Sequence, residues 1–175
     1  FGHRVYKNYD PRAALVRSQL ESALAGRAPQ QVGPITNKVN TSEGDVTHRA
    51  ALARSTFSVT GAGIKIGVLS DGVNSLATLQ ASGDLPASVT VLSGQAGNGD
   101  EGSAMLEIVH DLAPGAQLYF ATAFSGIASF ANNIKALRAA GCDIIIDDVG
   151  YFAETPFHQG QTAAVTSPNN AGLIQ

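Results

Sequence analysis

Two adjacent carboxylates, Asp100 and Glu101, lie in a glycine-rich stretch, Gly97–Met105, at the start of an apolar segment with helical spacing. The first turn of a helix offers backbone N–H groups without partners and the positive end of the helix dipole. A carboxylate placed there can be held in its charged form or used to move a proton. The stretch therefore predicts either a catalytic base or a helix cap.

Further carboxylates follow two short apolar runs. Asp71 comes after Ile64–Leu69, and the pair Asp147 and Asp148 comes after Ile144–Ile146. Such runs are typical of buried strands in a parallel sheet, and ligands of these sheets bind beyond the carboxyl ends of the strands. Adjacent carboxylates at a sheet edge rarely serve packing. One of the two aspartates after the second run is therefore a candidate site residue.

The elements that must position these side chains alternate between strand and helix. We expect further strands at Val89–Leu92 and Gln117–Ala123, and helices over residues 11–25, 45–55, 101–113 and 127–140. The helix over 45–55 is expected to have Asp45 as its cap, and residues 28–34 are expected to be a linker. This alternation predicts an α/β fold with a mainly parallel sheet and helices on both faces.

Composition excludes several classes of function. The chain has 175 residues, of which 44% are hydrophobic, enough for one domain with a core. A net charge of -3 without a cluster of Lys and Arg argues against nucleic-acid binding. No run approaches the ~18 apolar residues that a membrane span requires. The single cysteine, Cys142, precedes an apolar run and is expected to be a buried, inert thiol.

Two cofactor hypotheses are weak. Glycines 97, 99 and 102 have the spacing of a dinucleotide-binding fingerprint, but Asp100 and Glu101 would face the pyrophosphate. Like charges ~4 Å apart cost about 4 kcal/mol at an effective dielectric of 20. Glu107 and His110 have a metal-compatible spacing on one helix, but the partner motif is missing. The sequence therefore predicts no cofactor and no metal.

Taken in order, these blocks resemble the first part of a subtilisin-like serine peptidase, or subtilase. Residues 48–74 resemble the family's opening helix, its turn and the strand that ends in an Asp-x-Gly motif. Residues 101–123 resemble the block in which the catalytic histidine begins a helix leading to an Ala-Pro-x-Ala turn, here residues 113–116. Residues 126–150 resemble the next helix and the strand whose end binds the substrate backbone. The resemblance covers about residues 40–160.

The chain departs from the family pattern at the catalytic positions. Glu101 stands where the family has histidine, as it does in the related sedolisins, but the second acid of the sedolisins falls on Met105. The family's aspartate aligns with Ser70, and Asp71 is one residue later. The Gly-Thr-Ser-x-x-x-Pro motif of the nucleophile is not found, so we expect a fragment that stops before the nucleophilic serine.

The resemblance implies a serine-type endopeptidase domain at residues 41–175. An upstream helix and linker at 1–40 would precede it and would be the end of a propeptide. It implies catalytic roles for Asp71 and Glu101, and substrate binding by Asp148 and Gly150. A polypeptide would be the substrate, no cofactor would be needed, and the protein would be secreted. The alternative is a catalytically inactive subtilase-like domain that serves in binding or as a scaffold.

Overall fold

The structure of the protein is a computed structural model that describes residues 40–151. The helix expected over 11–25 and the linker expected over 28–34 lie outside the described residues, as does most of the region 1–40. All elements named below belong to the described part.

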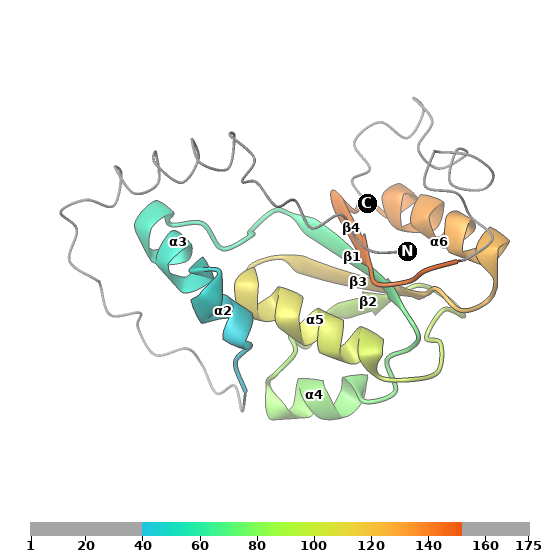
Figure 1. The fold of residues 1–175 in the computed structure, drawn as a ribbon, viewed down its shortest axis with the longest axis horizontal. Helices are drawn as coiled ribbons and strands as arrows, with labels where there is room; N and C mark the ends of the chain where they lie inside the picture. The colour runs from blue at the N-terminus through green and yellow to red at the C-terminus, as the bar shows by residue number, and fades with distance from the viewer. Residues whose placement is uncertain (1–39, 152–175) are drawn as a thin grey trace, which may run out of the picture. The chain divides into compact units, whose positions relative to one another are not determined.

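A four-stranded parallel sheet forms the centre of the fold (Figure 1). Its strands are β1 (Lys65–Ser70), β2 (Val89–Val91), β3 (Gln117–Thr122) and β4 (Ile144–Asp147), in the order β2-β3-β1-β4. All four apolar runs predicted to be strands are strands. The α/β class with a parallel sheet is confirmed.

Helices cover both faces of this sheet. The helices α4 (Leu76–Ser82) and α5 (Glu101–Leu112) lie against one face, and α6 (Ile127–Ala139) lies against the other (Figure 1). Side chains alternate along a strand, so Val68 of β1 packs on the α5 side and Leu69 on the α6 side. The fully buried Phe120 joins the α5 side, where burial of such a ring contributes roughly 1.5–3 kcal/mol.

The order of the strands places a topological switch point at the carboxyl ends of β1 and β3. These strands are neighbours, but the chain leaves β1 toward the α4 face and leaves β3 toward the α6 face. Ligands of open α/β sheets bind at such a switch point.

The β2–α5–β3 crossover also has the opposite hand to the other two. Crossovers between parallel strands are right-handed in about 98% of cases. Because both hands occur among these three crossovers, the fold contains the rare left-handed kind.

The prediction of one continuous helix over residues 45–55 is wrong. The structure has two helices there, α2 (Glu43–Thr47) and α3 (Ala50–Phe57), separated by Arg49 with a left-handed φ of 56°. The cap is also different: the Ser42 hydroxyl accepts the Gly44 N–H at 3.3 Å. Residues with left-handed φ interrupt a helix, and no sequence signal marked Arg49 for that conformation.

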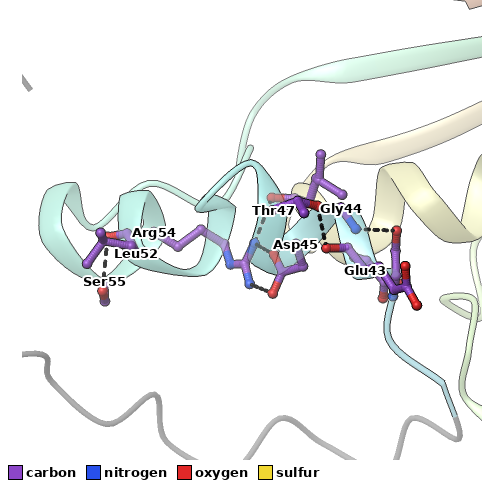
Figure 2. Close-up of polar contacts among 10 residues, drawn as sticks. Glu43, Gly44, Asp45, Thr47, Leu52, Arg54 and Ser55 are labelled. Carbon is purple, nitrogen blue, oxygen red and sulfur yellow. Dashed lines mark hydrogen bonds and ion pairs between the residues drawn. The ribbon is translucent and has the colours of Figure 1, made fainter. Parts of the chain in front are cut away.

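Asp45 instead holds α2 and α3 together (Figure 2). Its carboxylate accepts two hydrogen bonds from the Arg54 guanidinium, at 2.6 and 3.0 Å, and its side chain is only 5% exposed. Arg54 also donates to the Leu112 carbonyl at 3.0 Å, at the end of α5. This buried ion pair therefore fixes both short helices to the helix that begins at Glu101.

Candidate functional site

The glycine-rich stretch crosses the carboxyl end of β3 on its way from β2 to α5. The Thr122 N–H donates to the Gln95 carbonyl at 2.9 Å, and Gly97 then forms a bridge with Gly72, just beyond β1. A Cβ at Gly97 would lie 2.0 Å from the Asp71 carbonyl oxygen. Glycine is therefore required at this position, because the two backbones approach each other too closely for a side chain.

Glu101 is the first residue of α5, and its side chain is exposed to solvent. Its Oε2 accepts a hydrogen bond from the Ser70 hydroxyl at 3.2 Å. Ser70 is the last residue of β1, is fully buried, and lies on the strand face that packs against α5. Residues 31 positions apart therefore form a serine–glutamate pair, with the glutamate accessible and the serine enclosed.

Asp71 directs its carboxylate at the start of α5. Its Oδ1 accepts the Gly72 N–H at 2.5 Å and the Gly102 N–H at 3.1 Å. In the described part of the chain, Asp71 makes no hydrogen bond to Glu101. Asp71 thus acts on Glu101 indirectly, by fixing the backbone of the residue that follows it.

Asp100, the other carboxylate of the opening pair, joins the starts of two helices. It accepts the N–H and the hydroxyl of Ser75 at 2.7 and 2.9 Å, before α4, and the hydroxyl of Ser103 at 2.9 Å within α5. The hydrogen bond from the Ser75 backbone is the largest cause that lowers the pKa of Asp100. Asp100 is the N-cap residue of α5 by position, but its side chain accepts no N–H of that helix.

The second pair of carboxylates lies at the end of β4. Asp147 is the partner of Leu69 in the register of β1 and β4, so it lies at the same edge as Ser70. Burial, followed by the charge of Asp148, raises the pKa of Asp147, against the effect of its hydrogen bond from the Val149 N–H. Asp148 and Gly150, the expected substrate-binding residues, are exposed in the segment beyond this strand.

Three polar residues beside Asp71 were not predicted. Thr122, Asn133 and Gln95 form a network behind it, in which Thr122 and Asn133 are 5% and 6% exposed. One signal could have pointed to Asn133. It is an amide three residues after Phe130 and four before Leu137, within the apolar stripe of α6.

Two structural findings concern metals and membranes. Within residues 40–151, no group of three or more His, Cys, Asp or Glu side chains is arranged to hold a metal ion. No helix in the same range is long and apolar enough to cross a membrane.

The chain matches no known family model and no curated protein.

Proposed function

We propose that this protein carries the acid–base half of a serine-type endopeptidase site, with Glu101 as general base. One observation supports the proposal above all: residues 31 positions apart in the sequence meet at the carboxyl edge of the sheet. The Asp71 carboxylate accepts the N–H of Gly102, and the Ser70 hydroxyl donates to Glu101. The subtilase resemblance pairs the two sequence blocks to which these residues belong.

The chemistry follows from the exposure of each group. Ser70 is fully buried, so its hydroxyl orients the Glu101 carboxylate and does not reach a substrate. The other Glu101 oxygen accepts the proton of an attacking serine hydroxyl, which a part of the protein outside the described residues supplies. The serine oxygen bonds to the peptide carbonyl, and the proton passes from Glu101 to the leaving amine as the C–N bond breaks.

The remaining predicted residues have supporting roles in this proposal. Asp71 holds the start of α5, and therefore Glu101, through the Gly102 N–H. Asp148 and Gly150 lie beyond β4 and are exposed, so their backbone is available to an extended polypeptide. A carboxylate is a weaker base than an imidazole, so the activity is expected to be highest in acid. The resemblance further implies a secreted protein.

The test compares two glutamates that are both exposed in the first turn of a helix. Glu101→Gln removes the base and keeps its shape, and Glu43→Gln makes the same change in α2. In the full gene product, hydrolysis of unfolded casein should fall 10²–10⁴-fold for Glu101→Gln, the usual value of a general base. Glu43→Gln should keep wild-type activity. An unchanged rate and pH profile for Glu101→Gln would exclude Glu101 as the base.

A second function is favoured by the contacts of Asp71. Its Oδ1 is occupied by two backbone N–H groups, an arrangement that also serves a helix cap in a protein without catalysis. A subtilase-like binding or scaffold domain would keep this cap and lack turnover. Absence of casein hydrolysis by the wild-type gene product, together with retained binding of unfolded casein, would favour this alternative.

A further inference from the structure

Thr122 connects Asp71 to the loop that follows β3. It lies opposite Ser70 in the register of β1 and β3. Its hydroxyl donates to the Asp71 carbonyl oxygen at 3.0 Å, with a longer contact of 3.4 Å to the Ser70 carbonyl, and accepts the Phe124 N–H at 3.3 Å. We propose that Thr122 is a positioning residue for Asp71, an inference that rests on the proposed function.

Asn133 fixes Thr122 from the α6 side of the sheet. Its amide Nδ2 donates to the Thr122 carbonyl and to Gln95 Oε1, both at 2.7 Å. The Gln95 carbonyl in turn accepts the Thr122 N–H. Both peptide groups of Thr122 are therefore held, and its hydroxyl has a defined direction. An unsatisfied buried amide is costly, so Asn133 specifies this arrangement and no apolar residue could replace it.

The Asp71 peptide is thereby held from two sides. Its carbonyl oxygen accepts the Asn98 N–H at 3.0 Å in addition to the Thr122 hydroxyl. With this peptide fixed, the carboxylate reaches the Gly102 N–H at the start of α5. Phe124, 62% exposed on the loop after β3, is bonded to the same hydroxyl. A shift of that loop would therefore be transmitted to Asp71.

The activity test uses two substitutions at Thr122 and a matched control. Thr122→Val removes the hydroxyl and keeps the shape, Thr122→Ser restores the hydroxyl, and Thr90→Val makes the first change on the exposed side of β2. In the full gene product, kcat per folded molecule should fall at least tenfold for Thr122→Val, with KM within twofold. Thr122→Ser should return kcat to within threefold of wild type, and Thr90→Val should leave it unchanged.

A second measurement does not depend on activity. Amide hydrogen exchange of Asn98 and Gly102, which donate to Asp71, should accelerate about tenfold in Thr122→Val and not in Thr122→Ser. If wild type lacks activity while this exchange accelerates, the peptidase proposal fails and the link from Thr122 to Asp71 stands. A wild-type kcat in Thr122→Val, a failure of Thr122→Ser to rescue, or unchanged exchange would each overturn the positioning role.

Discussion

Adding one methyl group at Gly99 should displace the Asp71 carboxylate. A Cβ at Gly99 would lie 1.9 Å from Asp71 Oδ2, and its φ of 137° disfavours side chains. Gly94 is the control, because its φ of 72° is also positive but a Cβ there meets nothing within 4 Å. Gly94→Ala therefore tests the backbone strain alone, and Gly99→Ala tests the strain together with the clash.

The magnitudes follow from these contacts. Backbone strain alone costs about 1–2 kcal/mol, which is the loss expected for Gly94→Ala. Gly99→Ala should also weaken a hydrogen bond from Gly72 or Gly102 to the carboxylate, worth roughly 1.5–3 kcal/mol. We expect a total loss of about 4 kcal/mol in the free energy of unfolding, measured by urea denaturation with an unchanged m-value.

A double-mutant cycle isolates the clash from other effects. Asp71→Ala removes the carboxylate and leaves its own Cβ 3.1 Å from the new methyl group. The two substitutions should therefore destabilise by at least ~1 kcal/mol less than the sum of the single changes. Additive losses, or equal losses for Gly99→Ala and Gly94→Ala, would refute the close contact between Gly99 and the carboxylate.

Three further predictions concern buried charges and the thiol. Because the pKa of Asp147 is raised, the folded state binds its proton more tightly than the unfolded chain does. The free energy of unfolding therefore falls as pH rises from the pKa of this group in the unfolded chain to its higher pKa in the folded state. Asp147→Asn should therefore raise the free energy of unfolding by urea at pH 7 and leave it unchanged at pH 3. Burial raises the pKa of Cys142 to about 11, so iodoacetamide at pH 8 should modify the thiol only as the protein unfolds, as mass spectrometry can follow. Arg54→Ala should destabilise by about 3 kcal/mol in urea, because Asp45 would remain as a buried charge without its partner.

The sequence predicted the elements whose apolar residues are buried. The runs at 64–69 and 144–146 and the helices over 101–113 and 127–140 correspond to β1, β4, α5 and α6, with ends that differ by a few residues. The helix α4 was not predicted. It buries no residue fully and has no side-chain hydrogen bond at its N-cap, so neither periodicity nor capping marked it. Cys142 is buried, as expected.

The location of the candidate site could be predicted, and its internal contacts could not. The end of a strand is visible in the sequence, which was enough to predict Asp71 and Asp147 at one edge of the sheet. The contact between Ser70 and Glu101 depends on which strand face turns toward α5, and the sequence alone did not decide between residues 70 and 71. Asn133 acts through tertiary contacts alone. The catalytic roles stay predictions.

The strand order explains the path of the glycine-rich stretch. The strand β2 lies at the edge of the sheet, yet α5 packs against β1, so the chain must cross the end of β3 first. That crossing requires close backbone contact, which Gly97 and Gly99 permit. Gly99 lies directly against the Asp71 carboxylate. The same glycines therefore serve to bring Asp71, which follows β1, to the start of α5.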